Sequence, residues 1–353
     1  MAARRAGVVG TGLIGGSIGL ALRQRGWHVT GRDRDERTAA RALELGALDA
    51  LGVDPAAEVT FLATPVRAVA AAAEAALAGG AGIVTDVGSV KASIVDAVAD
   101  PRFIGGHPMA GSEQDGIDGA DADLFAGAVW VLTPTATTDD ASFARLRGVI
   151  TALGADVVAL TPEHHDALVA VVSHVPHLTA ASLMRMADDR SIEHRALLRL
   201  AAGGFRDMTR IASGHPGIWP DICAENRNAI VDVLDGLLES LTEVRGIVAG
   251  GDRDGLLTVL EQARAARANI PSRLTGAGDL CEVRVPVPDR AGVLAEVTTL
   301  AGTLDVNIAD LEIAHSSEGD RGVLILVVEA AAAERLRAGL VTAGYRPSVT
   351  PLE

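Results

Sequence analysis

The 353-residue sequence has almost no lysine, few aromatic residues and only two cysteines. Its 31 basic residues include a single lysine, Lys91, and 46 acidic residues leave a net charge of −15. Five Phe, three Trp and one Tyr are scattered along the chain. A nucleic-acid surface needs clustered basic residues, and single-strand binders add aromatic stacking platforms. Binding to nucleic acid is therefore not expected, although one locally basic pocket can still hold an anionic substrate.

Disulfides and membrane helices are not expected either. Cys223 and Cys281 lie far apart and form neither a CxxC pair nor a disulfide framework, which fits a reducing compartment. The apolar run at 6–22 contains six glycines, so it makes a poor signal or membrane helix. No other stretch reaches about 18 uninterrupted apolar residues. We expect a cytoplasmic protein without membrane association.

The length predicts two or three domains, and the content of 48% hydrophobic and 22% charged residues is that of a globular protein. Residues 1–160 alternate short apolar runs with helix-compatible stretches. The runs are residues 6–10, 27–31, 59–63, 82–86, 128–133 and 156–160. This alternation predicts a Rossmann-type α/β domain, a parallel sheet with helices on both faces.

Residues 161–270 have long helical patterns and few strand signals, which predicts an all-α domain. Between 221 and 248 apolar residues recur every three or four positions, as on one face of a helix about 40 Å long. A helix of this length needs a partner surface, and a homodimer would supply one. Residues 279–353 follow a Pro- and Gly-rich linker and predict an α+β domain with the order βαββαβ.

The first apolar run ends in a glycine-rich turn, GTGLIG at 10–15. In a GxGxxG turn the first glycine permits the sharp bend, the second lets the backbone approach a pyrophosphate, and the third lets helix and strand pack closely. Asp33 ends the next strand and would accept from ribose hydroxyls, which favours NAD over NADP, although Arg32 and Arg34 leave that choice open. The predicted cofactor-binding residues are Gly10, Gly12, Leu13, Ile14, Gly15, Asp33, Thr64 and Pro65.

Polar motifs follow at wider spacing. They are DVGSVK at 86–91, GGHPMAGSE at 105–113, HHD at 164–166, SHVPH at 173–177, GGFRDMTRI at 203–211 and HPGIW at 215–219. His107 stands between a glycine pair and a proline, which predicts a loop of defined, extended backbone. An imidazole titrates near neutral pH, so His107 is the candidate general base.

From the glycine-rich turn to the end of the helical domain, these motifs resemble the prephenate/arogenate dehydrogenase family of tyrosine biosynthesis. The resemblance implies NAD-dependent oxidative decarboxylation of prephenate. The C-terminal part resembles an ACT domain through DRAGVL at 289–294 and VNI at 306–308, with Ala291 in place of the usual proline. It implies feedback regulation, with L-tyrosine as a possible effector bound by Asp289, Gly292, Val293, Leu294 and Asn307.

The resemblance also implies roles for individual residues. His107 would be the base, and the Ser89 hydroxyl would orient it and touch substrate. Arg210 would clamp a substrate carboxylate through its planar guanidinium. The other substrate-binding residues implied are His177, Ser173, and the gating pair Glu113 and Arg206. Lys91, two residues after Ser89, would lie in the loop facing nicotinamide and substrate.

Several alternatives stay open. Trp219, His165 and Asp166 match motif positions, but packing accounts for them equally well. A metal site could be built from His164, His165, Asp166, His174 and His177. However, no HExxH or cysteine ligand is present and the family chemistry needs no metal, so none is expected. Three other functions are possible: an arogenate dehydrogenase, a β-hydroxyacid dehydrogenase, and a non-catalytic sensor of NAD and an amino acid. A β-hydroxyacid dehydrogenase gives no reason for the 105–113 motif.

Overall fold

The computed structural model describes residues 3–112, 114–191, 197–270, 280–288, 290–315 and 321–351. Glu113 and Asp289, two of the predicted site residues, lie outside this described part. The chain divides into two compact units, Met1–Gly246 and Ile247–Glu353, and each is treated by itself.

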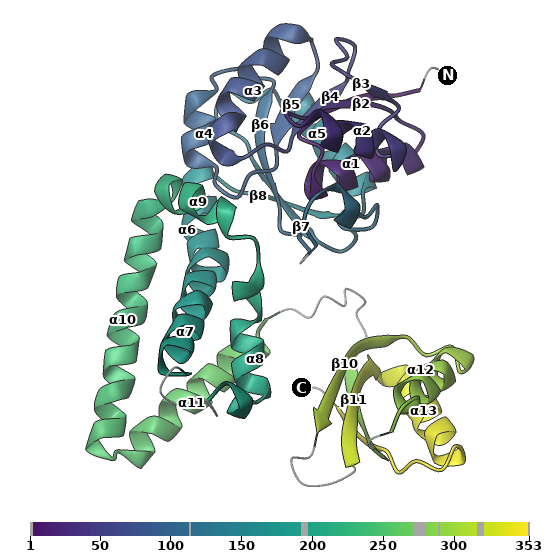
Figure 1. Ribbon diagram of the computed structural model, residues 1–353, viewed down its shortest axis with the longest axis vertical. Coiled ribbons are helices and arrows are strands. Elements are labelled where there is room, and N and C mark those ends of the chain that lie inside the picture. Colours follow the sequence, from purple (N-terminus) through teal and green to yellow (C-terminus); the bar gives the residue numbers. More distant parts are fainter. Residues whose placement is uncertain are drawn as a thin grey trace. The chain divides into compact units, whose positions relative to one another are not determined.

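The first unit contains an eight-stranded sheet in the order β3-β2-β1-β4-β5-β6-β7-β8 (Figure 1). Its strands are β1 Arg5–Val9, β2 His28–Arg32, β3 Ala50–Leu51, β4 Val59–Leu62, β5 Ile83–Asp86, β6 Phe103–Pro108, β7 Val129–Thr133 and β8 Asp156–Ala159. All six predicted strands are present. The sheet is not wholly parallel, because β6 and β7 pair antiparallel.

Strand β6 was not predicted, and it corrects the placement of His107 in a loop. Its sequence FIGGHP has two glycines and a proline, which are depleted in strands. All six residues are nevertheless buried, and the strand pairs with β5 on one side and β7 on the other. His107 is therefore part of the sheet itself, opposite Val131.

Helices α1 Leu13–Gln24, α2 Glu36–Glu44, α3 Val66–Gly79, α4 Ala92–Ala97 and α5 Asp140–Ala152 connect these strands. Two apolar clusters form between the sheet and its helices, the larger one around Phe61, Phe125 and Trp130. The chain leaves β1 toward β2 and later returns to β4 on the other side of β1. The crevice beside the C-terminal ends of β1 and β4 is thus a topological switch point, where open α/β sheets bind ligands.

Helices make up the rest of the first unit. They are α6 Pro162–Val169, a π-helical turn at Ala170–His174, α7 Val175–Ser191, α8 Gly203–Thr209, α9 Trp219–Glu225 and α10 Arg227–Gly250, whose last turn belongs to the second unit. The predicted single helix over 221–248 is wrong at its start, because the backbone leaves the helical region at Asn226 (φ −110°, ψ 30°) and divides α9 from α10. Leu234 and Leu237 of α10 pack with α7, which lies beside it in Figure 1.

The helical run Pro162–Ser191 is the one helix of the described residues that is long and apolar enough to cross a membrane. Length and composition alone are weak grounds for a membrane span, because core helices of globular proteins pass the same test. This run also carries the buried polar residues His165, Asp166 and His174. Two of them bond to the Rossmann-type sheet domain, as described below.

The second unit contains α11 Arg253–Ala268 and an antiparallel sheet in the order β10-β11-β9-β12. Its elements are β9 Leu280–Pro288, α12 Val293–Thr303, β10 Ile308–His315, β11 Arg321–Glu329, α13 Ala330–Thr342 and β12 Ser348–Pro351. The predicted βαββαβ order is confirmed, and its strand order is that of a ferredoxin-like fold. Valines of β9 and leucines of β11 and α13 form its core.

Candidate active site

The glycine-rich turn joins β1 to α1 at the switch point. Gly10 has φ +87°, and a Cβ there would lie 2.3 Å from the carbonyl oxygen of Ala63. A Cβ on Gly15 would lie 1.9 Å from the carbonyl oxygen of Gly10, so both positions require glycine for folding. A Cβ on Gly12 would meet nothing within 4 Å. The turn therefore leaves open space at Gly12, and the first turn of α1 holds no acidic residue that would repel an anion.

Two cavities flank the segment Ala63–Pro65, which begins just after β4. One, of about 450 Å³, is lined by Gly12–Gly15, by Ser89 and by residues of the 215–222 segment. The other, of about 730 Å³, is lined by Gly10, Asp33, Arg32, Arg34 and Arg67. All eight predicted cofactor-binding residues line one or both of these cavities.

Two polar groups that line these cavities are placed to bind a ligand. Asp33 Oδ2 accepts from the Thr11 backbone N–H at 2.7 Å, which fixes the carboxylate at the end of β2. The buried Thr64 hydroxyl oxygen has no hydrogen-bond partner within the described part of the chain. An unpartnered buried hydroxyl, a fixed carboxylate and open backbone at a helix N-terminus together suit a dinucleotide.

His107 lies at the start of a buried hydrogen-bonded chain. Its Nδ1 is 2.8 Å from Nε2 of His165, and Nδ1 of His165 is 2.8 Å from Oδ1 of Asp166. His165 is fully buried and Asp166 nearly so, whereas His107 keeps 8% of its surface exposed. Nε2 of His107 makes no hydrogen bond to any described residue.

Asp166 is itself held by the N-terminus of α4. Its Oδ1 accepts from the Lys91 backbone N–H at 2.8 Å, and its Oδ2 from the Ala92 N–H at 2.9 Å. The Asn226 amide donates to the Asp166 carbonyl oxygen at 2.8 Å and lies 3.2 Å from Nδ1 of His174. Thr161 caps α6, which fixes the start of the helix that carries His165 and Asp166. Together with the contact between His165 and His107, these hydrogen bonds join helices α4 and α6 to strand β6.

The side chain of Lys91 does not face a cavity as the sequence suggested. It is fully buried and forms an ion pair with Oδ2 of Asp86, and Nζ donates to the Gly106 carbonyl oxygen at 2.8 Å. Asp86 Oδ1 accepts from the Gly106 N–H at 3.1 Å. The ion pair thus holds both backbone groups of the residue before His107.

Burial shifts the titration of several of these groups. It lowers the pKa of His107 well below its ordinary value, the more so because a positive charge on His107 would be repelled by the Lys91 ammonium and by the imidazoles of His165 and His174 whenever these are protonated. Burial likewise lowers the pKa of His174 to about 4 and lowers that of His177. These three imidazoles are therefore neutral at pH 7. Burial also lowers the pKa of the Lys91 ammonium, against the opposing attraction of Asp86.

The remaining predicted substrate residues lie on the helices. His177 on α7 stacks on Trp219, with ring centroids 3.7 Å apart and planes 13° apart. Arg210 begins the 3₁₀ segment Arg210–Ser213, which packs against α7, and it is exposed. Arg206 is exposed and donates to the Ala201 carbonyl oxygen at 3.1 Å, and Ser173 is half-buried. Ser89 lines the smaller cofactor cavity but makes no hydrogen bond to His107, so its predicted role stays a prediction.

The alternative of a metal centre gains no support from this arrangement. Within the described ranges, no three or more His, Cys, Asp or Glu side chains gather in a way that could hold a metal ion. His165 and Asp166 bond to each other and to His107 and the α4 N-terminus instead.

Sequence comparison decides the family. Residues 18–159 match the family model described as prephenate dehydrogenase, nucleotide-binding domain, and residues 161–262 match prephenate dehydrogenase, dimerization domain. The chain belongs to the prephenate dehydrogenase family. It is 36% identical over 335 residues to a prephenate dehydrogenase of Bacillus subtilis, covering 90% of each chain.

Two solved structures of the family resemble the chain over about three quarters of its length. The prephenate dehydrogenase of Aquifex aeolicus, in complex with hydroxyphenyl propionate and NAD⁺, is 30% identical, with a TM-score of 0.71 over 77% of this chain and 99% of that one. Synechocystis arogenate dehydrogenase is 35% identical, with a TM-score of 0.64 over 74% of this chain and 98% of that one. The cofactor of this family member is NAD.

The sequence did not single out the partners of His107. In the sequence His165 and Asp166 are equally compatible with packing, His174 fits a metal-ligand pattern as well, and Asn226 belongs to none of the polar motifs. The available signal was three consecutive polar residues, HHD, just after a Thr-Pro helix start. In the structure these three residues lie near the N-terminus of α6. The sequence does not reveal that His107 of β6 lies opposite His165.

Proposed function

We propose that this chain oxidises and decarboxylates prephenate to 4-hydroxyphenylpyruvate, with His107 as the general base. His107 would take the C4 hydroxyl proton, and NAD⁺, when bound, would supply the acceptor for the hydride from C4 of the cyclohexadienyl ring. Loss of the ring carboxylate as CO₂ then yields an aromatic phenol, which drives the reaction forward. The observation that carries this proposal is a neutral, buried imidazole whose Nδ1 is hydrogen-bonded and whose Nε2 bonds to none of the described residues.

Residues 10–15, Asp33, Thr64 and Pro65 would hold the cofactor, which supplies a hydride acceptor when bound. On the substrate side, the exposed Arg210 is suited to a substrate carboxylate, and the exposed Arg206 would belong with Glu113 to the pair that gates the pocket. His177 is held by the Trp219 ring and is neutral, which suits contact with the keto side chain of prephenate. Ser89 lines the cavity from the β5–α4 segment and would contact substrate or nicotinamide.

Arogenate is the second candidate substrate, because a structure of this shape at 35% identity is an arogenate dehydrogenase. The two substrates differ only in a keto or an amino group on the side chain. Matched progress curves of NADH absorbance at 340 nm, with NAD⁺ and either prephenate or arogenate, test both. We expect a higher kcat/KM for prephenate. Binding of NAD⁺ without turnover of either compound would instead support a non-catalytic sensor.

We also propose a homodimer formed through the helical domain. Leu238 and Leu241 of α10 are 60% and 54% exposed in the single chain, and the matching family model is a dimerization domain. Paired apolar faces of this kind are typical of permanent interfaces. Sedimentation of the wild type and of Leu241→Glu tests this: a dimer that becomes monomeric supports the proposal, and a monomeric wild type contradicts it.

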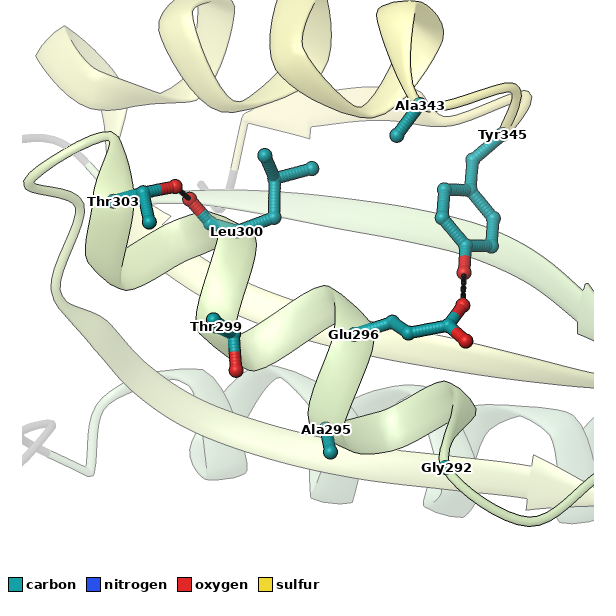
Figure 2. A pocket seen from close by; sticks show the side chains of 8 residues that line it. All are labelled: Gly292, Ala295, Glu296, Thr299, Leu300, Thr303, Ala343 and Tyr345. Atoms are coloured by element: carbon teal, nitrogen blue, oxygen red, sulfur yellow. Dashed lines mark hydrogen bonds between the residues drawn. The ribbon is translucent and has the colours of Figure 1, made fainter.

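We propose that the C-terminal domain, residues 279–353, is an ACT-like regulatory domain. The other two proposed domains are a cofactor domain at 1–160 and a substrate domain at 161–270. A cavity of about 600 Å³ lies between α12 and the segment after α13. Figure 2 shows the side chains that line it. Glu296 in its wall accepts from the Tyr345 hydroxyl at 2.9 Å and from Arg290 at 2.7 Å. Of the predicted effector residues, Gly292 lines this cavity, Leu294 and Asn307 are exposed, and Val293 belongs to the core.

Addition of L-tyrosine tests this regulation. We expect a lower initial rate with prephenate and a higher melting temperature, since a ligand that binds only the folded state stabilises it. If neither changes at millimolar tyrosine, the C-terminal domain is not a tyrosine sensor.

A further inference from the structure

The chain from His107 through His165 to Asp166 has only one polarity when Asp166 is ionised and His165 is neutral. A carboxylate can only accept hydrogen bonds, so Nδ1 of His165 must carry a proton and donate it to Asp166. A neutral His165 then has a bare Nε2, which must accept from a proton on Nδ1 of His107. His107 is therefore left with an unprotonated Nε2, the form that a general base requires.

The Asp166 end of this chain cannot readily turn. Both carboxylate oxygens accept backbone N–H groups at the start of α4, and its own carbonyl oxygen accepts from Asn226. The imidazole of His165 is fully buried between this carboxylate and His107, and the two rings meet edge to face with centroids 5.1 Å apart. Charge-assisted hydrogen bonds from two backbone donors keep the acceptor fixed in place.

We propose that His165 and Asp166 are positioning residues, which hold His107 in the tautomer that accepts the substrate proton at Nε2. The proton of the C4 hydroxyl moves to Nε2, and His107 becomes an imidazolium with both nitrogens protonated. The Nδ1 proton stays on His107, and the negative charge of Asp166, acting through the neutral His165, stabilises the new positive charge. This inference rests on the proposed role of His107 as the base.

Substitutions at 165 separate this role from simple filling of space. His165→Phe keeps an aromatic ring but removes both nitrogens, so the tautomer of His107 is no longer selected. His165→Gln keeps an oxygen that can accept from Nδ1 of His107. His164→Phe is the matched control, since the neighbouring His164 is exposed and outside the chain of hydrogen bonds.

For turnover of prephenate with saturating NAD⁺, we expect His165→Phe to lower kcat about 10²–10³-fold, with KM and NAD⁺ affinity changed less than about threefold. His165→Gln should recover kcat to within about tenfold of the wild type, and His164→Phe should match it. A wild-type kcat in His165→Phe, or equal losses in the Phe and Gln variants, would overturn the proposal.

Nitrogen-15 NMR of histidine-labelled wild-type protein gives a second readout, which does not depend on whether the His165 variants fold. At pH 7.5 His107 should show a protonated Nδ1 and an unprotonated Nε2, assigned by the loss of its signals in His107→Asn. The opposite tautomer would overturn the inference. A fully active His107→Asn variant would instead overturn the role of His107 as base, so the two failures are distinguishable.

Discussion

Lys91 and Asp86 form an ion pair in which neither side chain touches solvent. The ammonium donates to the carbonyl oxygen of Gly106, and the carboxylate accepts from its N–H. The backbone adjoining His107 is thus fixed by this pair, while its ring is fixed by His165. Two sets of buried polar contacts, joined where the Lys91 backbone N–H donates to Asp166, therefore define where the proposed base lies.

Removal of Lys91 alone should be costly. In Lys91→Met the Asp86 carboxylate loses its counter-charge while still buried, and a broken buried pair typically costs about 3–5 kcal/mol. In the double variant Asp86→Asn/Lys91→Met no charge is left unpaired, so the loss should be smaller. Urea unfolding of the three proteins measures both losses. A single variant as stable as the wild type would show that the pair contributes nothing to folding.

Lys91→Arg should also destabilise the protein, although its charge is kept. The Lys91 side chain is fully enclosed, and a planar guanidinium is larger than the ammonium that donates to Gly106. Overpacking of this kind costs about 1–3 kcal/mol. Thermal unfolding checks this, and an unchanged melting temperature together with unchanged kinetics would show that the single lysine is a coincidence of composition.

Substitutions of two glycines in the cofactor turn should separate effects on NAD⁺ binding from effects on folding. Gly12→Ala adds a methyl group into open space, so the melting temperature without ligand should stay within about 2 °C of the wild type. The same methyl group would occupy the approach to the pyrophosphate, and the affinity for NAD⁺ should fall at least about tenfold. Calorimetric titration measures it, and undiminished affinity would contradict the assigned cofactor site.

Gly15→Ala is the matched contrast to Gly12→Ala. Its Cβ would lie 1.9 Å from the Gly10 carbonyl oxygen, so the turn itself must move. We expect a loss of folding stability of about 1–3 kcal/mol before any ligand is added, measured by urea unfolding. Equal stability of the two variants would contradict the packing described for α1 and β1.

Stability should fall as the pH drops below about 6.5. The buried imidazoles of His107 and His174 and the half-buried imidazole of His177 have lowered pKa values, so the unfolded chain binds their protons first. For His174, with a pKa of about 4, the loss is on the order of 3 kcal/mol at pH 4. Urea unfolding between pH 7.5 and 4 measures this slope, and His174→Gln should flatten it. A slope unchanged by the substitution would contradict the assignment.

The sequence predicted much of the fold, because periodicity and turn chemistry are local. Six strands of the large sheet, the glycine-rich turn and the whole βαββαβ order followed from it. Strand β6 did not, since FIGGHP is held in the sheet by its neighbours rather than by its own propensity. The break at Asn226 was hidden for a similar reason: its side chain bonds to Asp166, 60 residues earlier.

The candidate site shows the same division. His107 was found from its flanking residues, whereas its contact with His165 joins positions 58 residues apart and depends on how α6 packs on the sheet. Lys91 was noted for its rarity and placed near the substrate, but burial and a partner five residues away direct it into the protein. Contacts between distant segments are what the sequence alone could not supply.

The rate of hydride transfer in His107→Asn tests the central claim most directly. In single-turnover mixing of enzyme, NAD⁺ and prephenate, NADH formation at 340 nm should be about 10²–10⁴-fold slower than in the wild type, the usual contribution of a positioned base. The affinity for NAD⁺ should be unchanged, because the cofactor cavities are lined by other residues. A variant that transfers hydride at the wild-type rate would contradict the account.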